Sequence, residues 1–196
     1  MIADLNWKWT LNAPSFRPAL YPDEGLLLAV SPPGVSFYDI WGGATDPEWL
    51  PYLAVVGGAT KEQLVMASCA VARLCFETND FLSLTMEERN GMTVALETAE
   101  AWCHGGATDE QVSNSHFNID TGTLVGNAAY YATMTYPNTL NFATSFSLVA
   151  YHALEVGVES QLICSTIRKH LVFEQPTRST VLTFWQRLAV EDDDLV

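Results

Sequence analysis

The sequence has few basic residues and places none of them between Arg89 and Arg168. It holds 9 lysines and arginines against 23 aspartates and glutamates, which gives a formal net charge of −14 at pH 7. Proteins that bind bare nucleic acid need basic side chains to displace the counterions of the phosphates. The shortage of positive charge therefore argues against direct nucleic-acid binding and favours a basic protein surface as the partner.

A long hydrophobic run is also missing. The longest apolar stretch, "GLLLAV" ending at Val30, is far shorter than the roughly 20 residues that a membrane-spanning helix needs. The first residues, "MIADLNWKWT", do not combine a basic segment with an apolar one, as a secretion signal does. We expect a cytoplasmic protein that makes no contact with membranes.

The four cysteines show no Cys-x-x-Cys spacing. Three of them lie among apolar residues in segments with helical periodicity, where a buried, reduced thiol is the usual arrangement. We expect neither a disulfide nor a zinc site, and no cofactor of another kind. The cysteines are Cys69, Cys75, Cys103 and Cys164.

One phrase occurs three times: "GGATKEQLV" at 57–65, "GGATDEQV" at 105–112 and a shorter "GGATD" at 42–46. In the two long copies a threonine precedes a glutamine by three residues, which is the spacing of a helix capping box. The glycines before it can adopt the left-handed conformation that ends a helix. The phrase therefore predicts the end of one helix and the start of the next, with Thr60 and Thr108 as N-caps.

Apolar periodicity predicts the helices themselves. The clearest segments are 61–77 and 86–104. The second is preceded by Thr85 as its N-cap, with Glu88 as the capping partner. Weaker patterns predict helix within 109–135, over 138–156 with Gly157 as its stop, and around 162–171. A last helix is expected after Pro176, before the acidic "EDDD".

The first 56 residues differ from the rest, because they hold seven of the nine prolines and four of the six tryptophans. "LNWKWTL" alternates like a half-buried strand, and "LLLAVSPPGVSFYDI" is consistent with two short strands around a proline turn. We predict a mainly α protein with about six helices in helix-turn-helix pairs. Residues 1–56 form a Trp- and Pro-rich arm or small β element, 57–190 the helical domain, and 191–196 an acidic tail.

Two long runs carry a resemblance to a known group of proteins. "DPEWLPYLAVVGGATKEQLVMASCAVARLC" and "EERNGMTVALETAEAWCHGGATDEQV", with "ICSTIRKHL" further on, resemble a loose group of alanine-rich, all-helical bacterial proteins. Some members of that group are regarded as immunity proteins of toxin systems. The resemblance covers about residues 45–175, and it implies a helical fold and an inhibitory role.

The acidic interval provides the candidate binding residues. The sequence contains no convincing set of catalytic residues, and we therefore expect a non-catalytic inhibitor of immunity or phage anti-defence type. Such a protein would dock on a basic protein and imitate the charge of nucleic acid. A rim of negative charge is the predicted contact surface. Its members are Glu97, Glu100, Asp109, Glu110 and Asp120.

Two other functions remain open at this stage. Carboxylates and histidines on helices can form a metal site or a catalytic cleft, and the candidates here are Glu97, Glu100, His104, His116 and His152. Alternatively, the aromatic arm could make the chain a self-assembling structural subunit, and so a homo-oligomer. Asp120-Thr121-Gly122 also matches the triplet of aspartic proteases, but it lies within a predicted helix and has no second copy.

Overall fold

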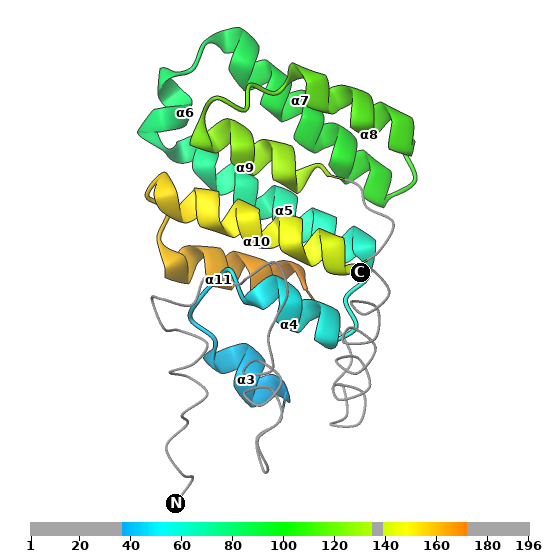
Figure 1. Ribbon diagram of the computed structural model, residues 1–196, viewed down its shortest axis with the longest axis vertical. Helices are drawn as coiled ribbons and strands as arrows, with labels where there is room; N and C mark the ends of the chain where they lie inside the picture. The colour runs from blue at the N-terminus through cyan, green and yellow to red at the C-terminus, as the bar shows by residue number, and fades with distance from the viewer. Residues whose placement is uncertain (1–36, 135–138, 172–196) are drawn as a thin grey trace, which may run out of the picture.

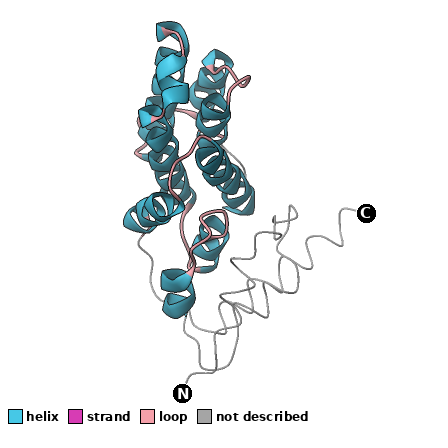
Figure 2. Cartoon of the chain, turned by 90° about the vertical axis from the view of Figure 1, so that its left-hand side faces the viewer, coloured by secondary structure: helices cyan, strands magenta, loops and turns pink. Residues whose placement is uncertain are grey.

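The computed structural model describes residues 37–134 and 139–171, and within these ranges all regular structure is helical. The helices stack from α3 at one end to α6, α7 and α8 at the other (Figure 1). Seen from the side, they form two layers (Figure 2). The α-helices are α3 (Phe37–Gly43), α4 (Leu50–Val56), α5 (Lys61–Leu74), α6 (Asn79–Ser83), α7 (Met86–Cys103), α8 (Asp109–Ser115), α9 (Leu124–Ala132), α10 (Thr139–Glu155) and α11 (Ser160–His170). Two 3-10 turns, η1 (Cys75–Glu77) and η2 (His116–Asn118), complete them.

The predicted mainly α fold is therefore confirmed. None of the helices in the described ranges is both long and apolar enough to cross a membrane. The predicted number of about six helices is too small, because the described residues alone contain nine. The stretch 109–135 holds two helices, and α3, α4 and α6 were not predicted.

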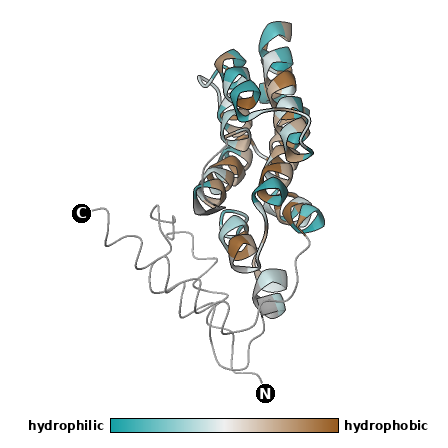
Figure 3. Cartoon of the chain, turned by 90° about the vertical axis from the view of Figure 1, so that its right-hand side faces the viewer, coloured by the Kyte–Doolittle hydropathy of each residue, from teal (hydrophilic) through white to brown (hydrophobic). Residues whose placement is uncertain are grey.

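Helices α5 and α10 occupy the centre of the stack. α10 packs against α4, α5 and α9, while α5 also contacts α7 and α11. Hydrophobic and hydrophilic residues occupy different sides of the helices (Figure 3), as expected where one side is buried. The largest fully buried side chains are Trp49, Leu50, Leu53, Leu64, Met92, Leu96, Phe146, Ile163 and Ile167.

Three helices end in the same way, with a glycine at positive φ. These glycines are Gly58 (φ 88°), Gly105 (φ 72°) and Gly157 (φ 92°), which follow α4, α7 and α10. In each case the next residue donates its N–H to a carbonyl five residues back, at 2.8–2.9 Å. This is the Schellman arrangement, and it needs a residue without a Cβ penalty at that position. The predicted stop at Gly157 is confirmed.

The predicted capping boxes are present at the start of α5, α7 and α8. The threonine side chain accepts the backbone N–H three residues on, and the glutamine or glutamate side chain in turn accepts the threonine N–H. The pairs are Thr60 with Gln63, Thr85 with Glu88, and Thr108 with Gln111. The two long copies of the repeated phrase therefore start α5 and α8, as predicted, and they join these helices to α4 and α7.

The third copy, at 42–46, makes a long-range contact instead. Arg168 of α11 donates to the carbonyl oxygens of Trp41, at 2.7 and 3.1 Å, and of Ala44. The Arg168 guanidinium also lies 5.9 Å from the centre of the Trp41 ring. Ser160 donates its hydroxyl to Thr45 O at 2.8 Å. The loop after α3 is thus held by α11, more than a hundred residues away in the chain.

The prediction for residues 35–40 is wrong where the structure describes them, because α3 begins at Phe37. The β-branched and aromatic residues of "VSFYDI" give only a weak local preference for a strand. Residues 50–56, which were assigned to the arm, form α4 instead. Trp49, just before this helix, and Leu50, its first residue, are both fully buried. The predicted strands within 1–36, the helix after Pro176 and the acidic tail lie outside the described residues.

Candidate functional site

Helices α7 and α8 form a hairpin at the outer end of the stack, joined by the second copy of the repeated phrase (Figure 1). The indole N–H of Trp102, near the end of α7, donates to the Asp109 carboxylate at 2.6 Å. Asp109 is the first residue of α8, where negative charge is stabilised by the helix dipole. The Trp102 ring stacks on Phe142 of α10, at a centroid distance of 6.3 Å. These contacts hold α8 against α7 and anchor α7 on α10.

The predicted acidic rim is spread over this hairpin and the connection that follows it. Glu97 is exposed in the middle of α7, and Asp109 and Glu110 are exposed at the start of α8. Asp120 is also exposed, but it lies after η2, in the connection to α9. The five residues therefore do not form one continuous cluster.

Glu100 differs from the other four because it has a positive partner. Its two carboxylate oxygens accept hydrogen bonds from Nε and Nη2 of Arg73 at 2.8 and 2.9 Å. The pair is half-buried, with side-chain exposures of 34% for Arg73 and 28% for Glu100. The hydrogen bond to Glu100 raises the pKa of Arg73. Glu100 is therefore a structural link between α5 and α7 and cannot serve as an unpaired member of the rim.

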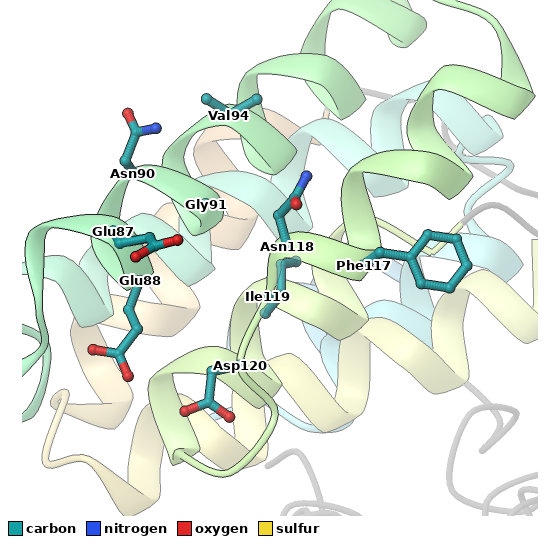
Figure 4. Close-up of a pocket in the computed structure, with 9 residues that line it drawn as sticks. All are labelled: Glu87, Glu88, Asn90, Gly91, Val94, Phe117, Asn118, Ile119 and Asp120. Atoms are coloured by element: carbon teal, nitrogen blue, oxygen red, sulfur yellow. The ribbon is translucent and has the colours of Figure 1, made fainter.

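Asp120 contributes to an open pocket that the sequence did not predict (Figure 4). The pocket has a volume of about 600 Å³ and lies between the first half of α7 and the residues of η2 and its exit. Glu87 and Glu88 of α7 lie at the same end as Asp120, whereas Phe117 stands on the other side and projects outward. The pocket is lined by Glu87, Glu88, Asn90, Gly91, Val94, Phe117, Asn118, Ile119 and Asp120.

A close backbone contact fixes the wall of this pocket. A Cβ added to Gly91 would collide with the carbonyl oxygen of Asn118, so only glycine lets η2 approach α7 this closely. Ile119, next in the chain, is 7% exposed and belongs to the core. The Asp120 carboxylate accepts the N–H of Gly122 at 2.8 Å. The Asp-Thr-Gly triplet is therefore a turn that leads into α9.

Apart from Asp120, the pocket residues were not predicted, because their sequence patterns are not specific to a binding site. Glu87 and Glu88 were visible only as acidic residues in the first turn of a helix, where they are common for local reasons. Phe117 was, together with Ile119, one of only two large apolar residues in "SNSHFNID". Its exposure depends on the short 3-10 turn, which apolar periodicity does not predict.

The histidines of the metal alternative lie on separate elements. His104 is exposed at the end of α7, whereas His116 Nε2 contacts the carbonyl oxygen of Thr133 at 2.7 Å. The His152 ring stacks on Tyr131 at a centroid distance of 5.7 Å. Among the residues that the structure describes, no group of three or more histidine, cysteine or acidic side chains could hold a metal ion. The predicted set of Glu100, His104, His116 and His152 is therefore not brought together.

Burial governs the protonation of the cysteines and of two histidines. It raises the pKa of Cys75 and Cys103 to about 12, so both thiols remain protonated at neutral pH. Burial also lowers the pKa values of His116 and His152 from the usual 6.5. All four cysteines are free, consistent with the predicted reduced thiols.

Comparison with known proteins gives no matching family model, no matching curated protein and no matching solved structure. The resemblance to alanine-rich helical proteins stays a prediction from the motifs in the sequence.

Proposed function

We propose that this chain is a non-catalytic, acidic interaction protein that binds a basic surface of another protein and inhibits it, in the manner of an immunity or anti-defence protein. The observation that carries this proposal is the charge of the outer hairpin and its connection to α9. Residues 86–120 hold seven carboxylates and a single basic residue, Arg89. That surface is suited to a partner that normally holds nucleic acid.

Among the described residues, the two arginines close to the hairpin are already engaged. Arg89 donates to the carbonyl oxygens of Leu82 and Leu84, at 2.9–3.3 Å, and its guanidinium faces the Phe81 ring. Arg73 pairs with Glu100. Glu97, Asp109 and Glu110 are exposed and form no ion pair among the described residues, so their negative charge can attract a basic partner. Such a field speeds encounters with a basic surface and weakens as salt screens it.

The test is a capture experiment followed by an affinity measurement. The full chain is immobilised, exposed to lysates of bacterial cells with and without phage infection, and washed at low and at high salt. Each captured protein is then purified, its charge is determined, and its affinity is measured by calorimetry at both salt concentrations. A basic protein whose activity is blocked on binding would support the proposal.

Matched charge variants show whether the hairpin makes the contact. The double variant Glu97→Gln/Glu110→Gln removes two charges from it, whereas Glu155→Gln/Glu159→Gln removes two charges near the turn between α10 and α11. We expect the first variant to weaken binding by about three- to tenfold, since exposed charges contribute up to about 1 kcal/mol each. The second should bind nearly as the parent does. Equal affinities for the parent and both variants would contradict the proposal.

A further inference from the structure

The pocket between α7 and η2 combines exposed apolar side chains with negative charge. Phe117 is 86% exposed and Val94 is 42% exposed. Five of the seven large hydrophobic residues exposed in the described part of the chain lie between positions 82 and 124 of the sequence, and two of them, Val94 and Phe117, line the pocket. The five are Leu82, Met86, Val94, Phe117 and Leu124. Large apolar side chains left in contact with water beside a pocket are typical of surfaces that bind a partner.

At the charged end of the pocket, local hydrogen bonds favour the ionised form of Glu88. Glu88 accepts hydrogen bonds from both the N–H and the hydroxyl of Thr85 at 2.6 Å, and these bonds lower its pKa. Glu87 and Asp120 are exposed at the same end of the pocket (Figure 4). A cationic side chain entering there would meet three carboxylates, while its apolar neighbours would meet Val94 and Phe117.

The wall of the pocket is held in place before any partner binds. Gly91 allows η2 to lie directly against α7, and Ile119 anchors the exit of η2 in the core. Little of the binding energy would therefore be spent on ordering the backbone. Phe117 projects outward beside this fixed wall and can contact a partner without rearrangement of the core.

We propose that this pocket anchors a basic, amphipathic segment of the partner protein, with an arginine or lysine at Glu87, Glu88 and Asp120 and an adjacent apolar side chain against Phe117 and Val94. This inference rests on the proposed function, because it specifies where and how the basic partner docks. Charge decides between occupants: a second copy of this chain, with its net charge of −14, would be repelled.

The test uses two synthetic peptides of equal positive charge and the isotope-labelled full chain. One peptide has arginine and leucine at helical spacing, and the other has glycine in place of every leucine. At low salt, the arginine–leucine peptide should shift the NMR signals of Gly91, Val94, Phe117 and Asn118. It should bind about tenfold more tightly than the glycine peptide, because it also buries apolar surface.

Matched variants separate the pocket from the general acidity of the chain. Asp120→Asn and Glu159→Gln each remove one charge, the second from the exposed residue before α11, and asparagine can still accept the Gly122 N–H. Phe117→Ala and Leu162→Ala each truncate an exposed apolar side chain, the second on α11. We expect Asp120→Asn and Phe117→Ala to weaken binding of the arginine–leucine peptide several-fold, and the two controls to change it little.

The outcomes distinguish this inference from the proposed function. Signals that shift around Glu97 and Glu110 while the pocket residues stay unchanged would overturn the pocket inference and leave the proposed function intact. Equal binding of both peptides would also overturn it, because the apolar contact would contribute nothing. If neither peptide binds at low salt, the inference and the proposed electrostatic function both fail.

Discussion

Gly91 is the residue on which the contact between α7 and η2 depends. A Cβ at this position would collide with the carbonyl oxygen of Asn118 and move η2 away from α7. We predict that Gly91→Ala lowers the free energy of unfolding by about 1–3 kcal/mol, as overpacking usually does. The measurement is chemical denaturation of the parent and the variant in parallel.

Gly42 in α3 provides the control, because no described residue lies within 4 Å of a Cβ built there. Gly42→Ala should be neutral or should stabilise the protein by about 0.4–1 kcal/mol, by restricting the unfolded chain. A loss at Gly91 no larger than the change at Gly42 would mean that η2 adjusts without cost.

His152 makes the stability of the fold depend on pH. Its Nδ1 is buried without a hydrogen-bond partner among the described residues, and its ring contacts the rings of Tyr131 and Tyr151. Burial lowers the pKa of His152, whereas the charge of Glu155 acts in the opposite direction. Burial outweighs Glu155, so the folded pKa lies below the unfolded value of 6.5. The unfolded state therefore binds more protons as the pH falls through that value, and stability is lost there.

We predict that the parent loses more stability than His152→Phe between about pH 7 and about pH 5.5. Phenylalanine keeps the stacking on Tyr131 and cannot be protonated. Urea denaturation at several pH values gives the comparison. His116 should contribute a similar loss to both proteins, because its pKa is also lowered by burial. Parallel pH profiles for the two proteins would refute the assignment to His152.

At the scale of elements, the same capping box supports two helices of different length. α5 has 14 residues and many buried side chains, whereas α8 has seven residues and buries only Val112 and Ser115. We predict that Thr60→Ala and Thr108→Ala each cost about 1 kcal/mol. Hydrogen exchange should become faster throughout the protein for Thr60→Ala but only in α8 for Thr108→Ala, because short helices open locally. Global acceleration in both variants would contradict this difference.

The ends of helices were predictable from the sequence because capping depends on neighbours within one turn. Thr60, Thr85 and Thr108 are recognised from three-residue spacings, and Gly157 from its place after an apolar pattern. α4 was missed because Pro51 was interpreted as part of an extended arm, although proline is favourable in the first turn of a helix. α6 was missed because five residues are too few for a periodic pattern.

At the scale of the whole molecule, the sequence predicted how much charge there is but not how it is paired. Glu100 was expected to be unpaired because no basic residue occurs between Arg89 and Arg168. The packing of α5 against α7 brings Arg73 to it from outside that interval. Asp120 likewise meets Glu87 and Glu88 only because the hairpin returns the chain to the start of α7. Both results depend on tertiary contacts, which local patterns do not specify.

The net charge of −14 also predicts how salt acts on the fold. Like charges repel one another in the compact state, and at physiological ionic strength salt largely screens this repulsion between exposed charges that are more than about 8 Å apart. We predict that raising sodium chloride from low to physiological concentration stabilises the protein. The half-buried Arg73–Glu100 pair is screened less than exposed charges, so its weakening should not cancel the gain.

Thermal unfolding of the parent and Glu97→Lys at both salt concentrations checks this prediction. The substitution replaces an exposed negative charge on α7 by a positive one, and it should raise the melting temperature more at low salt than at high salt. Salt should also narrow the difference between the two proteins, because it reduces the repulsion that the substitution relieves. A melting temperature that falls with salt in the parent would show that specific ion pairs outweigh the net repulsion in this fold.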